Sequence, residues 1–113
     1  MSEEEMAMER TPIGRPAAGL TGLDEVRAQI DRIDAALIGL LAERAAYVRR
    51  AGELKRTEAE ARAPARVEAV ITRVRAQAKE VGLSPEVAER TWRAMIAAFI
   101  DQEIADIAGR RNG

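Results

Sequence analysis

The chain has 113 residues, of which 47% are apolar and 33% charged, and its formal net charge is −1. This length allows one domain with a modest core, and the balanced charge argues against a nucleic-acid binder. Cys and His are both absent, which excludes disulfides, thiolate nucleophiles, imidazole bases and the usual zinc sites, so we expect no metal. With one Trp, one Tyr and one Phe, the composition favours an all-α fold.

Residues 1–20 contain acids, two prolines and two glycines without any periodicity, which predicts a disordered N-terminal tail. The first ten residues lack a basic region followed by an apolar one, so we expect no signal peptide and a cytoplasmic protein. No apolar run approaches the roughly 18 residues of a membrane span. We therefore expect no membrane partner.

A long first helix is predicted over residues 21–55. Thr21 and Asp24 have the spacing of a capping box and place the helix start just before Leu23. Such a helix would be about 50 Å long, whereas a compact chain of about 100 residues has a radius of gyration of about 13 Å. A second copy of the chain is expected to cover the protruding half, as a two-fold homodimer with packed long helices. The apolar residues recur in steps of three and four: Leu23, Val26, Ile30, Ile33, Leu37, Leu40, Tyr47, Ala51 and Leu54.

The stretch after the long helix is predicted to be a short connection followed by a second helix. Residues 56–63 are polar with alternating charge, which is typical of a loop or a frayed helical turn. Pro64 then begins an amphipathic helix. Gly82 is expected to end it, since glycine is favoured just after a helix C-terminus.

A third helix is predicted from the Ser84–Pro85 pair, which supplies a hydroxyl N-cap and a proline at the first helical position. This helix should run to about Ile107, and residues 109–113 should form a frayed, basic end. The helical domain is thus predicted to span residues 21–108, with three helices of which the first is long.

Arg44 breaks the apolar pattern of the first helix, because it stands between Leu40 and Tyr47 where an apolar residue is expected. No acid lies three or four residues from it, so a buried Arg44 would need a partner from elsewhere in the fold or from a ligand. Alternatively, its charged end reaches solvent or pairs with the second subunit. Lys55 follows eleven residues later, within about 20° of the same helix face.

Three further charged residues enter the site hypothesis. Arg27 points about 100° away from the Arg44 face, so it could join the site only from a partner subunit; a surface ion pair with Asp24 or Asp31 is the alternative. Glu103 lies at the centre of the apolar stripe of the third helix without a base nearby. Burial there would favour the neutral acid, which can donate a hydrogen bond. Alternatively, Glu103 lies at the solvated rim of a subunit interface. Arg66 lies at the edge of its stripe and is weak evidence by pattern alone.

These residues together predict a pocket with two or more cations and one acid, and without a nucleophile. Such a pocket suits a small polyanion, because arginine binds carboxylates bidentately and fixed charges stabilise charge developing on an oxygen. It is poorly equipped for covalent catalysis.

The chain resembles the small all-helical (type II) chorismate mutases and the closely related isochorismate-pyruvate lyase. The resemblance covers about residues 21–107 and is carried by the stretch TGLDEVRAQIDRIDAALIGLLAERAAYVRRAGELK, by APARV and by GLSPE. It implies an intertwined homodimer with two equivalent active sites and no cofactor.

The resemblance also implies roles for single residues. Arg44 and Lys55 would bind a dicarboxylate substrate from one subunit, and Arg27 would reach in from the other. Arg66 would add a contact to a carboxylate. Glu103 falls where the family places Gln or Glu against the ether oxygen of the enolpyruvyl group, so Lys55, Glu103 and Arg44 are the expected catalytic residues.

Two positions depart from the mutase pattern. Mutases of this class commonly carry acids that hold the ring hydroxyl where this chain has Ala63 and Val67, and there the lyase is the better match; yet the lyase carries Gln where this chain has Glu103. We predict a chorismate mutase that rearranges chorismate to prephenate. The alternatives are an isochorismate-pyruvate lyase and a non-catalytic helical dimerisation module.

Overall fold

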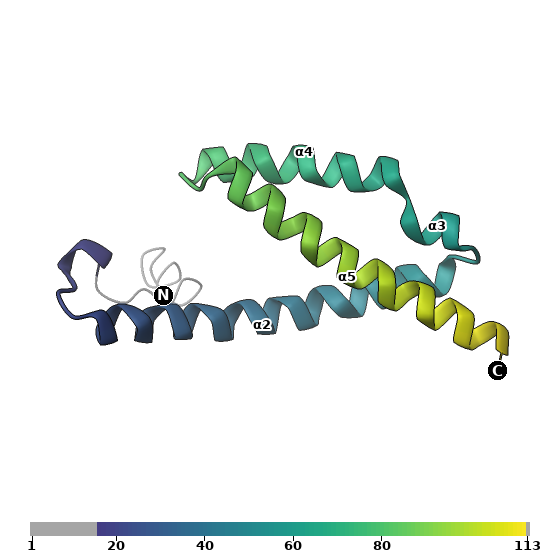
Figure 1. Ribbon diagram of the computed structural model, residues 1–113, viewed down its shortest axis with the longest axis horizontal. Coiled ribbons are helices and arrows are strands. Elements are labelled where there is room, and N and C mark those ends of the chain that lie inside the picture. Colours follow the sequence, from purple (N-terminus) through teal and green to yellow (C-terminus); the bar gives the residue numbers. More distant parts are fainter. Residues whose placement is uncertain (1–15, 113) are drawn as a thin grey trace, which may run out of the picture. The chain divides into compact units, whose positions relative to one another are not determined.

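The computed structural model describes residues 16–112, and all regular elements within them are helices, as predicted. The lower-numbered part of the expected tail, residues 1–15, lies outside the described residues. No helix in the described part is long and apolar enough to cross a membrane. The elements in chain order (Figure 1) are the 3₁₀ helix η1 (Ala17–Gly19) and the α-helices α2 (Leu23–Leu54), α3 (Glu58–Arg62), α4 (Pro64–Glu80) and α5 (Pro85–Asn112).

Helix α2 is a single helix of 32 residues that begins at Leu23, as the sequence predicts. Its first turn closes where the Val26 N–H donates to the Gly22 carbonyl at 3.2 Å. The chain divides within this helix into two compact units, residues 1–42 and 43–113. In the described part of the first unit most of the apolar row is exposed, including Leu23 (61%) and Leu40 (61%), whereas Val26 is half-buried.

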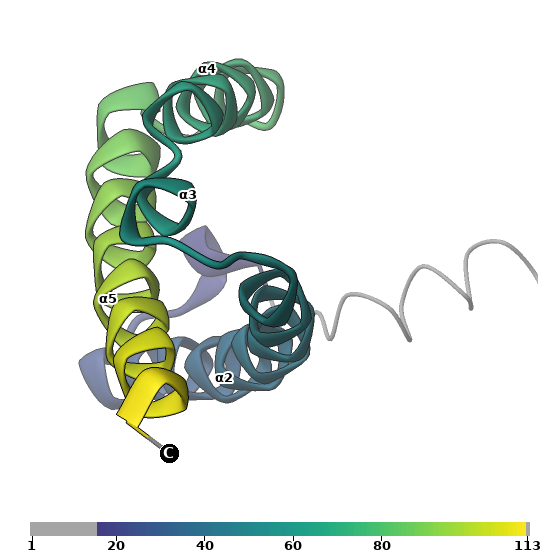
Figure 2. The same ribbon diagram turned by 90° about the vertical axis from the view of Figure 1, so that its right-hand side faces the viewer.

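The stretch after α2, for which we expected a loop or a frayed helical turn, contains a short helix of five residues, α3. The Thr57 hydroxyl accepts a hydrogen bond from the Glu60 N–H at 3.1 Å, and the Glu60 carboxylate accepts one from the Arg56 N–H at 2.7 Å. The first bond satisfies an N–H group that a helix start leaves free, and the second ties the residue before the N-cap to the first turn. Figure 2 shows α3 as a separate piece in the connection between α2 and α4.

Helices α3 and α4 are joined through one residue, Ala63, which has a left-handed backbone conformation with φ 35° and ψ 61°. This conformation costs a residue with a side chain roughly 1–2 kcal/mol. Pro64 then occupies the first position of α4, where its missing N–H costs no helical hydrogen bond. The sharp turn brings Ala63 and the start of α4 next to the candidate site described below.

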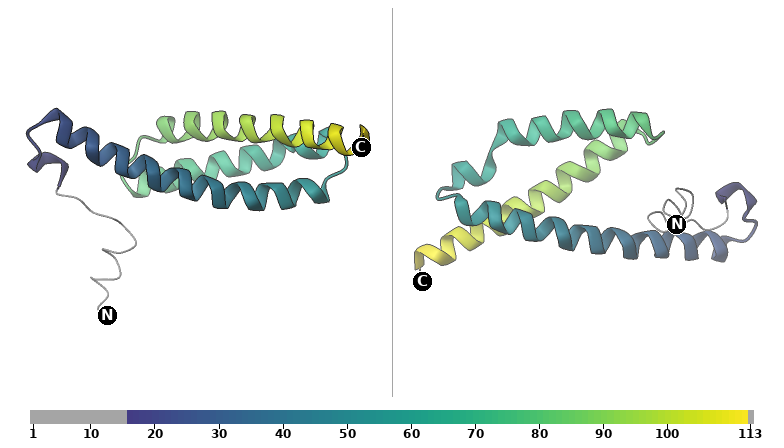
Figure 3. Two further views of the ribbon diagram at one scale, coloured as in Figure 1. Left: turned by 90° about the horizontal axis from the view of Figure 1, so that it is seen from below. Right: turned by 180° about the vertical axis from the view of Figure 1, so that it is seen from behind.

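Helices α4 and α5 form a hairpin that meets at a tight turn and opens away from it (Figures 1 and 3). Gly82 (φ 78°) ends α4 as predicted: the Leu83 N–H donates to the Ala78 carbonyl at 2.9 Å and the Gly82 N–H to the Lys79 carbonyl at 3.3 Å, which is a Schellman cap. The Ser84 hydroxyl accepts from the Val87 N–H at 3.3 Å and caps α5. The turn chemistry read from the sequence is confirmed.

Small apolar residues allow the two helices of the hairpin to approach closely. Val74 and Ala78 of α4 and Ala88 of α5 are buried together, and Val70 and Trp92 pack against them. On the surface of the hairpin, Arg93 of α5 donates to both carboxylate oxygens of Glu68 on α4 at 2.8 Å. These contacts fix the two helices side by side.

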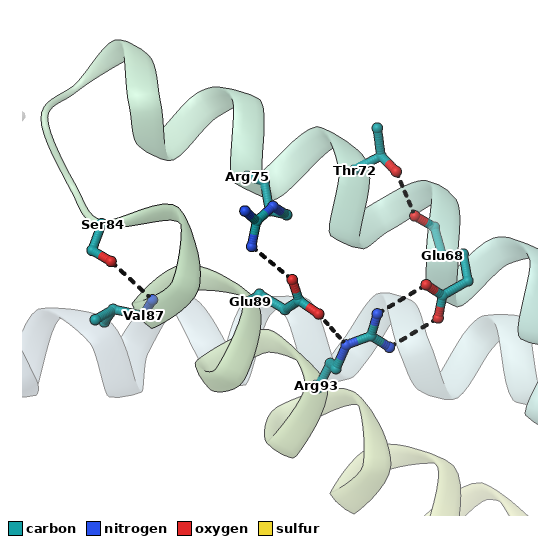
Figure 4. A network of polar contacts seen from close by, with 7 residues as sticks. All are labelled: Glu68, Thr72, Arg75, Ser84, Val87, Glu89 and Arg93. Carbon is teal, nitrogen blue, oxygen red and sulfur yellow. Dashed lines mark hydrogen bonds and ion pairs between the residues drawn. The ribbon is translucent and has the colours of Figure 1, made fainter.

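The same surface carries a second acid, so that Arg93 forms the centre of a charged cluster (Figure 4). Arg93 Nε donates to Glu89 at 2.7 Å, and Arg75 donates to the other Glu89 oxygen at 2.7 Å. The hydrogen bonds from Arg93 hold the pKa of Glu68 and of Glu89 below the usual value, and they raise the pKa of Arg93. The cluster therefore ties α4 to α5 most strongly when both acids are ionised.

Helix α5 extends to Asn112, beyond the expected end near Ile107. Residues 109–112, for which we expected a frayed end, are helical. One reason is that Arg110 donates hydrogen bonds to the carbonyl oxygens of Gly52 at 3.1 Å and of Lys55 at 3.2 Å. The C-terminal turn of α5 is thus anchored to the C-terminal end of α2.

Candidate active site

A cavity of about 340 Å³ lies within the second unit, between the C-terminal part of α2, the α3–α4 junction and the middle of α5. Its charged lining consists of four cations and one acid: Arg44, Lys55, Arg62, Arg66 and Glu103. Its apolar lining includes Ala61, Val67, Val70, Ile96, Phe99 and Ile100. Four of the five residues proposed from the sequence therefore line one cavity.

Arg44 enters this cavity with an unmet hydrogen-bonding capacity. Its Nη1 is buried and has no hydrogen-bond partner among the described residues. The guanidinium carbon lies 5.3 Å from the centroid of the Phe99 ring, a distance at which the ring face attracts the cation. Because an unpaired buried donor costs free energy, this geometry favours a ligand with an acceptor oxygen at Nη1.

Lys55 and Glu103 form an ion pair across the cavity, from residues 48 positions apart in the sequence. Lys55 Nζ lies 3.0 Å from Glu103 Oε2, and the Glu103 side chain is 9% exposed. No base for Glu103 is visible among its neighbours on the same helix, because the base comes from the end of α2. The pair fixes the ammonium group in place.

The Glu103 side chain lies beside Gly52 of α2. Gly52 is buried, and a Cβ atom built on it would lie 3.5 Å from Glu103 Cγ and 3.8 Å from Cδ. These are ordinary van der Waals distances, so the aliphatic part of Glu103 lies next to the backbone of α2 with room for a methyl group between them. The acid is therefore supported on its aliphatic side as well as by the ammonium.

Two exposed arginines complete the cationic lining. Arg66 lies in the first turns of α4, where the sequence proposed it. Arg62 of α3 was not proposed from the sequence, where Glu58 lies four residues before it and can balance its charge. In the structure these two residues are indeed paired, with Arg62 Nη2 2.7 Å from Glu58 Oε1. Only the position of α3 beside the cavity identifies Arg62 as a lining residue.

The cavity wall near the start of α4 is apolar. Ala63 and Val67, which stand where the resembling mutases commonly carry acids, both line the cavity. No carboxylate from these positions can therefore accept a hydrogen bond from a ligand hydroxyl. A ligand in the cavity would therefore contact methyl groups of Ala63 and Val67 on this wall and cationic side chains elsewhere.

Arg27 belongs to the first unit and is not among the residues that line the cavity. It is exposed, and the expected ion pairs with Asp24 and Asp31 are not formed within the described residues. Its guanidinium thus has no partner in the described part of one chain. Its role at the site of a second subunit stays a prediction.

The arrangement can bind a small dianion and stabilise negative charge on a ligand oxygen. Arginines can receive carboxylates in bidentate fashion, and the ammonium of Lys55 is held in a partly buried position where a hydrogen bond to an ionised group is stronger than in water. Among residues 16–112, no cluster of acidic side chains is placed to hold a metal ion. The side chains themselves are suited to positioning and electrostatics.

Comparison with known proteins identifies the family of this chain. A family model for type II chorismate mutase matches residues 26–104, a range that contains all five residues proposed from the sequence. Isochorismate pyruvate lyase of Pseudomonas aeruginosa is 36% identical over 84 residues, which cover 74% of this chain and 83% of that protein. With the helical fold and the cationic cavity, these matches show that the chain belongs to the type II chorismate mutase family.

Proposed function

We propose that the cavity binds chorismate and rearranges it to prephenate. The observation that carries this proposal is the buried, unpaired Nη1 of Arg44 in a cavity that it shares with Lys55 and Arg66. These three of the four cations in the cavity match a substrate with two carboxylates. The volume of about 340 Å³ is at the lower end of the range typical of small-molecule sites.

The reaction itself needs little chemistry from the protein. In a concerted [3,3] rearrangement, the bond between the ether oxygen and the ring carbon breaks while the new carbon–carbon bond forms. The enzyme holds the reactive conformer and stabilises negative charge on the ether oxygen. Arg44 and Arg66 hold the carboxylates, and the Lys55 ammonium donates to the ether oxygen.

Glu103 has two opposing effects on this reaction. Its carboxylate fixes the Lys55 ammonium at 3.0 Å, but its negative charge opposes the charge that develops on the ether oxygen.

The active form is a homodimer in which Arg27 completes the site of the partner subunit. The exposed apolar row of α2, which includes Ile30, Ile33 and Leu37 at about half exposure each, supports this assembly. Complementation tests it: Arg27→Ala and Arg44→Ala are each expected to be inactive. After mixing and reassembly, half of the dimers are mixed and each has one intact site, so about a quarter of wild-type activity should return. No recovery would refute the shared site.

Isochorismate-pyruvate lyase is the second candidate, and a specific observation favours it. The wall at Ala63 and Val67 offers no acid to a ring hydroxyl, and the relative from Pseudomonas aeruginosa is named for this reaction. Its products would be salicylate and pyruvate. In this reaction, too, Lys55 would stabilise negative charge on the ether oxygen of the substrate. The distinction between the two reactions therefore rests on the product.

The experiment is a paired assay of purified protein with chorismate and with isochorismate, in which each product is identified by chromatography. Efficient formation of prephenate supports the mutase. Salicylate with only slow prephenate formation assigns the lyase. Turnover of neither substrate, together with a stable Arg44→Leu variant, would instead indicate the non-catalytic dimerisation module.

A further inference from the structure

We infer that Arg110 is a positioning residue for Lys55, holding the backbone of Lys55 while Glu103 holds its ammonium group. This inference rests on the proposed function, in which Lys55 donates to the reacting oxygen. Arg110 lies beyond residue 104, where the match to the family ends. Nothing in the family resemblance therefore assigns it a role.

The first step of the argument is where α2 ends. Its last residue is Leu54, so Lys55 is the first residue after the helix, and the last carbonyl groups of a helix have no partner within it. The Gly52 carbonyl accepts from the Lys55 N–H at 3.1 Å, which tightens the final turn. Lys55 would otherwise be free to rotate about its own backbone bonds.

Arg110 removes that freedom from outside the helix. Its Nη2 donates to the Gly52 carbonyl at 3.1 Å and to the Lys55 carbonyl at 3.2 Å. A cation at this end of a helix is also favoured by the helix dipole. One guanidinium nitrogen thus bridges the last turn of α2 and the residue that follows it.

The second step is that both contacts to Lys55 come from one rigid element. Glu103 and Arg110 are seven residues apart on α5, which is about two turns and returns to nearly the same face. Glu103 holds Nζ at 3.0 Å and Arg110 holds the carbonyl oxygen at 3.2 Å. Helix α5 therefore fixes Lys55 at both ends, which pre-organises a long side chain that would otherwise sample many rotamers.

Rates test this inference first. Arg110→Gln removes the charge and the geometry of the fork, and we expect kcat to fall roughly tenfold while KM changes less than about twofold, because substrate carboxylates are held elsewhere. Arg110→Lys keeps a cationic donor and should recover part of the loss. The matched control is Arg90→Gln, an exposed arginine on the same helix, which should leave both constants unchanged.

A labelling experiment tests the positioning without any activity. The sequence contains two lysines, Lys55 and Lys79, and Lys79 is exposed at the end of α4. Brief acetylation of the whole protein followed by peptide mass spectrometry gives the modification rate of Lys55 relative to that of Lys79. This ratio should be low in the wild type and rise severalfold in Arg110→Gln, and Glu103→Gln provides a positive control because it weakens the hold on the ammonium.

The outcomes separate the inference from the function on which it rests. A raised labelling ratio with a lowered kcat supports the role of Arg110. An unchanged labelling ratio overturns the inference, even if the variant is less heat-stable, since Arg110 would then only tie the helix ends together. A raised labelling ratio with an unchanged kcat would show that the position of Lys55 does not limit the rate, and this overturns the role of Arg110 in catalysis. If the wild type turns over neither substrate, the proposed function fails, while the labelling ratio still decides whether Arg110 positions Lys55.

Discussion

Replacing Arg44 by methionine should make the protein more stable and nearly inactive. Methionine suits this position because it is unbranched, fills irregular apolar space and carries no charge. In the wild type, Nη1 of Arg44 is buried without a partner among the described residues. The substitution removes this unmet donor together with the group that the proposed substrate needs.

The expected size of the effect follows from two opposing terms. An unsatisfied buried donor costs about 1–3 kcal/mol, and the contact between the guanidinium and Phe99, 5.3 Å from the ring centroid, recovers about 0.5–1 kcal/mol. The difference predicts that Arg44→Met raises the free energy of unfolding by about 1 kcal/mol. For a domain of this size that corresponds to an increase in Tm of about 4–8 °C.

The effect on catalysis should be larger and opposite in sign. A hydrogen bond between charged partners contributes about 1.5–3 kcal/mol, and a bidentate contact has two of them, so kcat/KM should fall at least about 100-fold. Thermal unfolding at fixed protein concentration and the product assay measure the two effects on the same samples. Arg73→Met, at an exposed position on α4, is the matched control. A variant that is destabilised by more than about 1 kcal/mol and keeps its activity would refute the reasoning.

Two further outcomes are expected. Arg93 lowers the pKa of Glu68 and of Glu89, so its contribution to stability is complete above their ordinary pKa of 4.5 and is lost as the pH falls through the lowered pKa values. The difference in Tm between wild type and Arg93→Gln should therefore shrink on acidification. A constant difference would contradict the stabilising role of the cluster. At Ala63, with φ 35°, substitution by glycine should raise Tm and substitution by valine should lower it; the reverse order would show that the backbone strain is absent.

Local signals in the sequence predicted most of the fold. The start of α2, the start and end of α4 and the start of α5 each follow from residues next to one another in the chain, such as Gly82 and the Ser84–Pro85 pair. Helix α3 was predicted only as a loop or a frayed helical turn, although Thr57 and Glu60 have the spacing of a helix start, because the segment has no apolar stripe and was assigned from its charge pattern. The periodicity of apolar residues reveals helices that bury one face. It does not reveal α3, in which Ala61 is the buried residue.

The candidate site could be predicted in part, for a similar reason. Arg44 could be singled out because no acid lies three or four residues from it on its own helix, and finding such an acid requires only the local sequence. The partner of Glu103 is 48 residues distant, and Arg62 satisfies the local test through Glu58, so neither contact is visible in a helical pattern. Arg110 was assigned to a frayed end because its acceptors are backbone carbonyl groups, which no sequence pattern marks.

The Schellman turn at Gly82 has a consequence for the order of folding. It joins α4 and α5 through a turn of a few residues, and a short loop loses little entropy when it closes. The hairpin with its buried Val74, Ala78 and Ala88 should therefore form early. The contact between Lys55 and Glu103 must close a much longer loop, so the cavity should be completed late, and a bound dianion should slow unfolding chiefly by holding the end of α2 in place.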